Sequence, residues 1–171
     1  MKNRRQFIKT LFWAAPVVYV ACKQGSNPIP TNLGTTKPSS SGIEKITKTD
    51  AEWQKILTPK QYGVLRKEDT EARHSSPHNN EKRNGVFVCA GCALPLFKSE
   101  NKYDSGTGWP SFTKPIPGSL GTKEDKKLFT TRTEYHCIRC GGHQGHVFND
   151  GPAPEGTRYC NNGVALNFVP A

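Results

Sequence analysis

The spacing of apolar residues in this chain changes from a short helical pattern to strand-like runs. Thr49-Asp50-Ala51-Glu52 has the spacing of a capping box, and the apolar residues that follow it predict a helix over residues 50–57, with Trp53 in the core. Thr58-Pro59 begins a second predicted helix that ends near Leu65, because proline suits the first helical position. Residues 66–84 are polar and predict a loop that wraps the domain.

Strand-like runs fill most of the remaining sequence. Short β-branched and aromatic runs occur at residues 86–88, 128–138 and 164–169. Gly/Pro turns at 115–118 and 151–156 separate them, and no long helical period follows residue 65. The pattern predicts a mainly β domain with antiparallel strands and short N-terminal helices.

The first 45 residues do not resemble the rest. Residues 1–22 combine a basic start, which is similar to a twin-arginine export signal, with an apolar run from Leu11 to Ala21 that is too short to span a membrane. The run ends at Cys22, in a sequence similar to the lipobox of bacterial lipoproteins, although an uncleaved signal anchor or a secreted soluble enzyme remain alternatives. Residues 23–45 are rich in Ser, Pro, Gly and Thr and predict a flexible tether. We therefore expect an exported protein on the periplasmic or cell-envelope side, tethered to a membrane, with one folded domain at 46–171.

The net charge of +10 suggests nucleic-acid binding until its distribution is considered. Four of the positive charges lie in the leader, so a chain without it carries +6, spread along the sequence with acids interspersed. This distribution favours a solvated basic surface, and we expect no nucleic-acid partner. We also expect a monomer.

Four cysteines form two pairs with metal-site spacing. Cys89-x-x-Cys92 and Cys137-x-x-Cys140 together supply the four thiolates of a closed tetrahedral site, so we expect one structural zinc ion that joins two distant hairpins. Disulfides are the alternative in an exported protein.

A fifth cysteine of the domain, Cys160, has a different setting. If residues 157–162 are extended, Arg158, Cys160 and Asn162 share one face, since side chains alternate along a strand. A neighbouring positive charge favours the thiolate, which makes Cys160 a candidate nucleophile. A small buried hydrophobe is the equally plausible alternative on spacing alone.

Several motifs in order resemble the B-type peptide methionine sulfoxide reductases. They are Lys102-Tyr-Asp-Ser-Gly-Thr-Gly-Trp-Pro-Ser-Phe112, His143-x-x-His146-Val-Phe, Asp150-Gly-Pro and Arg158-Tyr-Cys160-x-Asn162, together with the second cysteine pair. The resemblance covers roughly residues 50–169. It implies two antiparallel β-sheets joined by a four-cysteine zinc site, and thiol-dependent reduction of the R epimer of methionine sulfoxide in oxidised proteins or peptides.

The resemblance also implies roles for single residues. Cys160 matches the nucleophile, which forms a sulfenic acid, and Trp109 matches the aromatic wall that receives the substrate methyl group. The remaining matched residues are polar: Arg158 favours the thiolate, Asp150 orients the histidines, and His143, His146 and Asn162 orient the substrate and help to deliver a proton.

One departure from the family pattern concerns recycling. Many members have a second reactive cysteine at the position of Thr107, and a threonine hydroxyl cannot form a disulfide. We therefore expect an external, thioredoxin-like thiol reductant as a partner.

Two other function classes would use part of these residues. A zinc-ribbon binding module for nucleic acid or protein would use the knuckles and the basic surface, but it gives no purpose to Arg158-Tyr-Cys160. Hydrolysis at zinc requires an open metal position, and four cysteines close the site.

Overall fold

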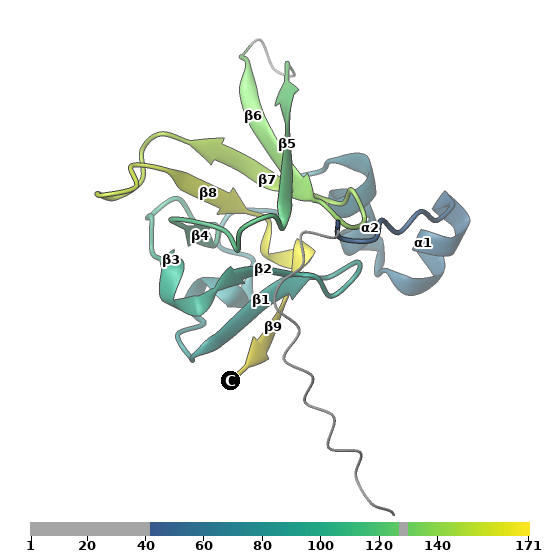
Figure 1. Cartoon of the computed structure of the whole chain (residues 1–171), viewed down its shortest axis with the longest axis horizontal. Coiled ribbons are helices and arrows are strands. Elements are labelled where there is room, and N and C mark those ends of the chain that lie inside the picture. The colour runs from purple at the N-terminus through teal and green to yellow at the C-terminus, as the bar shows by residue number, and fades with distance from the viewer. Residues whose placement is uncertain (1–41, 127–129) are drawn as a thin grey trace, which may run out of the picture. The chain divides into compact units, whose positions relative to one another are not determined.

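The computed structural model describes residues 42–126 and 130–171 (Figure 1). The predicted export signal with Cys22, and most of the predicted tether, lie outside the described residues. Within the described ranges, no helix is long and apolar enough to cross a membrane.

Two short helices begin the described domain as the capping boxes predict. Helix α1 spans Asp50–Ile56, and helix α2 spans Pro59–Lys67. In both, the N-cap threonine accepts a hydrogen bond from the backbone of the third helical residue, and that residue's side chain accepts one from the threonine backbone. Helix α2 is two residues longer than predicted and ends at Glu68, whose backbone is left-handed with φ 62°.

The described residues contain nine strands in two antiparallel sheets, which confirms the predicted fold class (Figure 1). The smaller sheet has the order β2-β1-β9, with β1 at Gly85–Cys89, β2 at Pro95–Lys98 and β9 at Leu166–Pro170. The larger sheet has the order β3-β4-β8-β7-β6-β5. Its strands are β3 (Lys102–Tyr103), β4 (Ser111–Phe112), β5 (Leu120–Asp125), β6 (Arg132–Cys137), β7 (His143–Phe148) and β8 (Arg158–Asn161).

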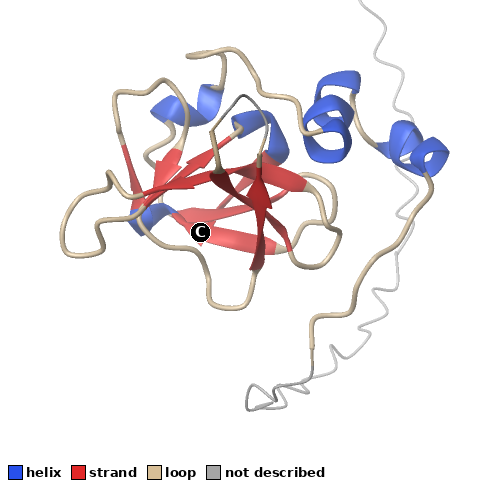
Figure 2. Ribbon diagram, turned by 90° about the horizontal axis from the view of Figure 1, so that it is seen from above, coloured by secondary structure: helices blue, strands red, loops and turns tan. Residues whose placement is uncertain are grey.

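Short 3₁₀ helices connect several strands and lie outside the sheets (Figure 2). They include η1 at Pro77–Asn80, η2 at Ser99–Asn101 and η4 at Gly163–Ala165. Helix η4 replaces the beginning of the strand predicted at 164–169, so the last strand starts at Leu166.

The hydrophobic core lies between the two sheets and extends to the helices. Phe97 of the small sheet stacks on Phe112 of the large sheet with ring centroids 4.1 Å apart, and Tyr135 packs edge-on against Phe97. Trp53 of α1 is 1% exposed, which confirms its predicted place in the core. One face of the large sheet is therefore apolar, and its other face is free to carry chemistry.

Candidate active site

A row of polar side chains crosses the second face of the large sheet. The strand register places directly opposed residues in the order Tyr103, Ser111, Cys160, His146, Glu134 and Lys123, from β3 to β5. Directly opposed residues point to the same face, and their Cβ atoms lie about 4.5–5.5 Å apart. Cys160 is therefore the immediate neighbour of His146, and the residues flanking it in sequence, such as Tyr159, face the core.

Cys160 lines a hollow of about 210 Å³ whose lining contains both aromatic and polar residues. Trp109 and Phe148 supply aromatic surface, while His146 and Asn162 supply polar groups. A larger cavity of about 550 Å³ lies between α2, the loop after it and η4, but its lining contains no thiol. Of these two hollows, the smaller one is therefore the candidate active site, and its volume suits one side chain.

Two opposing effects act on the Cys160 thiol. Burial raises its pKa above the ordinary value, while the charge of Arg158 and hydrogen bonds from Thr107 and Arg158 lower it in part. The net effect is a raised pKa. Arg158 lowers the pKa of Cys160, as predicted, but burial raises it by more. Cys160 is thus held mainly as a thiol at neutral pH.

Arg158 is buried and paired with Asp150. Its guanidinium donates two hydrogen bonds of 2.8 Å to the two carboxylate oxygens of Asp150, and it lies 4.4 Å from the Phe148 ring centroid. Asp150 is expected to orient the histidines, and the hydrogen bonds of its carboxylate in this structure go to Arg158. Asp150 instead fixes the guanidinium beside Cys160.

The histidines are oriented by two other carboxylates. His143 Nδ1 lies 3.0 Å from Glu134 Oε1, and His146 Nε2 lies 2.8 Å from Asp125 Oδ2. The two imidazole rings are 5.5 Å apart. Only His146 lines the hollow, while His143 is 2% exposed and lies behind it on β7.

A strap formed by residues 68–76 closes one side of the hollow. Within it, the backbone of Glu71 donates to Asn162 Oδ1 at 3.0 Å and accepts from Trp109 Nε1 at 3.1 Å. The Glu71 carboxylate accepts hydrogen bonds from the backbone amides of Gly163 and Val164. The predicted wrapping loop thus positions both the aromatic wall and the carboxamide of the site.

Thr107 lies beside the Cys160 sulfur. Its hydroxyl contributes a hydrogen bond to Cys160 and is 2.8 Å from Ser105 Oγ, which in turn is 2.8 Å from Ser111 Oγ. A hydroxyl group therefore occupies the neighbourhood in which a recycling thiol would act.

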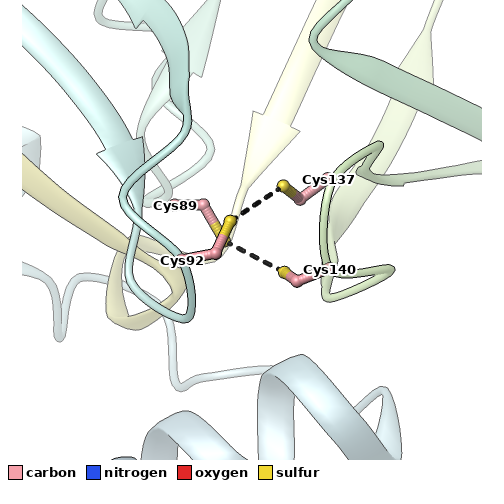
Figure 3. Close-up of side chains that lie close together, drawn as sticks. All are labelled: Cys89, Cys92, Cys137 and Cys140. Atoms are coloured by element: carbon pink, nitrogen blue, oxygen red, sulfur yellow. Dashed lines mark hydrogen bonds between the residues drawn. The ribbon is translucent and has the colours of Figure 1, made fainter. Parts of the chain in front are cut away.

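The other four cysteines of the described residues form one cluster (Figure 3). All four sulfur atoms lie within 4.8 Å of one another, with 3.6 Å between Cys89 and Cys140 and 3.5 Å between Cys92 and Cys137. These separations far exceed the roughly 2.05 Å of a disulfide bond and are close to the ~3.8 Å edge of a tetrahedron with Zn–S bonds of about 2.3 Å. The cluster could hold one metal ion, as the two Cys-x-x-Cys pairs predict.

Several residues of the site carry no sequence signal that we used. Asp125 and Glu134 lie on β5 and β6, and Thr70 and Glu71 lie in the strap. The alternation of Arg132 and Glu134 on one strand places both on one face, but it does not identify the histidines as their neighbours.

Together the fold and site define a class of protein: a two-sheet β domain with a cysteine cluster and one separate thiol in a hollow lined by aromatic and polar residues. The model of the SelR domain family matches residues 57–170. The peptide methionine sulfoxide reductase MsrB of Agrobacterium fabrum is 46% identical over 127 residues, which are 74% of this chain and 94% of that protein. MsrB of Methanosarcina barkeri is 51% identical over 124 residues, 72% of this chain and 87% of that protein. The chain belongs to the SelR family.

Among solved structures, the Mis18 "Yippee-like" domain matches with a TM-score of 0.43 and 17% identity, over 52% of this chain and 98% of that one. This likeness is too weak to carry an argument.

Proposed function

We propose that this protein reduces the R epimer of methionine sulfoxide in oxidised proteins and peptides to methionine, with Cys160 as the nucleophile. The relatives that match most of the chain are named for this reductase activity, and family membership supports it. The zinc-ribbon binding module is not favoured, because the family match includes the site around Cys160 as well as the knuckles.

The observation that carries the proposal is that aromatic and polar residues line the same hollow around Cys160. A methyl sulfoxide presents an apolar methyl group and a polar oxygen on the same sulfur. Trp109 and Phe148 offer surface for the methyl group, and His146 and Asn162 offer hydrogen-bonding groups for the oxygen. With both substituents fixed, only one epimer directs its sulfur at Cys160.

The chemistry follows from the protonation state of Cys160. Because burial holds the thiol protonated, its proton must leave as the sulfur attacks, and His146 on the adjacent strand is placed to accept it. The imidazolium then returns the proton to the sulfoxide oxygen. Oxygen moves from the substrate sulfur to Cys160, which gives methionine and a sulfenic acid on Cys160.

Recycling requires an external thiol. Thr107 beside Cys160 has no thiol, and the other four described cysteines are clustered with one another. Two equivalents of an external thiol, such as a thioredoxin-like dithiol, reduce the sulfenic acid to the thiol, with release of water and formation of a disulfide in the partner.

The cysteine cluster suits a structural zinc ion. Four buried or half-buried thiolates with tetrahedral spacing match the preference of Zn²⁺, and they leave no open position for catalysis. Cys89 and Cys92 would hold it from the β1–β2 turn, and Cys137 and Cys140 from the β6–β7 turn. The ion would cross-link the two sheets.

The cellular setting rests on the leader sequence alone. The basic start, the apolar run and Cys22 support export and a lipid anchor on the cell-envelope side, with the domain acting as a monomer on oxidised proteins there.

The test is stereospecific reductase activity. The purified protein with dithiothreitol is given a peptide that contains either the R or the S epimer of methionine sulfoxide, and methionine is measured by mass spectrometry. We expect turnover of the R epimer alone. Equal reduction of both epimers, or none of either, would overturn the proposal.

A further inference from the structure

Each histidine of the site has a carboxylate on one of its ring nitrogens. Asp125 Oδ2 lies 2.8 Å from His146 Nε2, and Glu134 Oε1 lies 3.0 Å from His143 Nδ1. Both carboxylates are buried, with side chains 7% and 3% exposed. They come from β5 and β6, two strands that carry none of the catalytic or substrate-binding residues predicted from the sequence.

Each of these carboxylates is also bound by a cation. Arg132 donates a hydrogen bond of 2.7 Å to Asp125, and Lys123 lies 3.0 Å from Glu134 Oε2. Lys123 is in turn bonded to Glu68 at the end of α2. Each histidine therefore faces a buried carboxylate that is also held by a cation.

The contacts determine which ring nitrogen of each histidine remains for other partners. His146 uses Nε2 for Asp125, and this leaves Nδ1. Glu134 Oε1 lies at ion-pair distance from Nδ1 of His143, but neither of the buried ring nitrogens of His143 has a hydrogen-bond partner in the part of the chain that the structure describes. A buried ring nitrogen without a partner is costly unless a ligand or water satisfies it.

We propose that Asp125 and Glu134 are positioning residues of the reductase site: Asp125 orients His146 and stabilises its imidazolium form, which gives a proton to the departing sulfoxide oxygen, and Glu134 holds the neighbouring ring of His143. The inference rests on the proposed function. It assigns the work of orienting the histidines, expected of Asp150, to two carboxylates on different strands. Asp125 holds Nε2 of His146, whose ring lines the hollow, while Glu134 lies beside Nδ1 of His143, whose ring does not line it.

The groups that face His146 give the sign of the effect. They are Asp125 on β5, Arg132 and Glu134 on β6, His143 on β7 and Cys160 on β8. Burial lowers the pKa of His146, Asp125 raises it, and Arg132 and His143 lower it. Loss of the Asp125 charge must therefore lower this pKa further, so that less imidazolium is present at a given pH.

The decisive experiment compares the pH dependence of R-epimer reduction in the wild type and in Asp125→Asn. If imidazolium is required, activity falls as pH rises through the His146 pKa. We expect this alkaline limb to move to lower pH by about 1 unit in the variant, with a loss of activity of roughly 10-fold at the alkaline end and a smaller loss near pH 6. The matched control is Glu124→Gln, which removes an acid from the adjacent position of β5, where the side chain is 59% exposed and paired with Lys126. Its profile should equal that of the wild type.

A measurement independent of turnover completes the test. Nitrogen-detected NMR of the imidazole rings reports the tautomer and pKa of each histidine, and Glu134→Gln should alter the Nδ1 signal of His143 without altering the cysteine cluster. Loss of activity by the same factor at every pH in Asp125→Asn, with unchanged ring signals, would mean a merely structural role and would overturn the inference. Failure of the proposed function would differ, because the wild type itself would then not reduce the R epimer.

Discussion

Two regions of this domain use the same amino acid for opposite purposes. In the cluster, four cysteines on two tight turns face one another, and their sulfur atoms all lie within 4.8 Å of one another. Cys160 lies on a strand in the row of polar residues, with His146 on one side and Ser111 on the other. The comparison shows that backbone setting decides a thiol's role: turns bring sulfurs together for a metal, whereas a strand presents one sulfur to a substrate.

Replacement of the isolated thiol should give the largest change in activity. In Cys160→Ser the hydroxyl is a far weaker nucleophile, so we expect reduction of the R epimer to fall by about 1,000-fold or more, as occurs when other enzymes lose their nucleophile. Zinc content, measured by elemental mass spectrometry, and the melting temperature should stay near the wild-type values. A Cys160→Ser protein that has lost its metal would contradict the division of roles.

Replacement of a clustered thiol should act on the fold instead. In Cys89→Ser one ligand of the cluster is lost at a fully buried position. We expect zinc to be lost and the free energy of unfolding to fall by roughly 3 kcal/mol or more, because binding of structural zinc is folding free energy. Denaturant unfolding with and without a chelator measures this. A variant that remains as stable as the wild type and loses only turnover would place Cys89 in the chemistry and break the comparison.

The smallest effect on activity is expected for a substitution that gives Cys160 a second thiol as a neighbour, as the clustered cysteines have. Thr107→Cys places a second thiol beside Cys160, so one turnover without reductant should end in an intramolecular disulfide, while the wild type ends in a sulfenic acid on Cys160. The rate of the first turnover should change by less than about 3-fold, because the nucleophile and its histidine are untouched. Mass spectrometry after trapping with dimedone distinguishes the products. A disulfide to Cys160 in the wild type would show that another cysteine serves for recycling.

Local signals predicted the local structure well. Thr49 and Thr58 are N-caps with capping boxes, as their spacing predicts, and residues 158–161 form a strand. The two cysteine pairs meet, and each pair lies on one tight turn. These signals lie within a few residues of each other, where sequence spacing fixes geometry.

Contacts across the sheet could not be predicted in the same way. The resemblance to the family implies that Asp150 orients the histidines, yet the carboxylate of Asp150 binds Arg158 across the turn between β7 and β8. The true partners, Asp125 and Glu134, depend on the register of β5, β6 and β7, and a shift by one residue would turn them to the core face. The pairing of distant strands therefore determines the contacts between the carboxylates and the histidines, which sequence spacing could not predict.

The strap also determines when during synthesis the site becomes complete. Glu71 must bind Asn162, Gly163 and Val164, which lie more than 90 residues later in the chain, and β9 must pair with β1. Until the end of the domain has been synthesised, Glu71 cannot join Trp109 to Asn162, even when every earlier part of the domain is complete. Contacts of such long sequence separation form slowly, because the entropy of closing the loop is lost before they form. The nascent protein is thus expected to stay catalytically silent until its last strand has emerged.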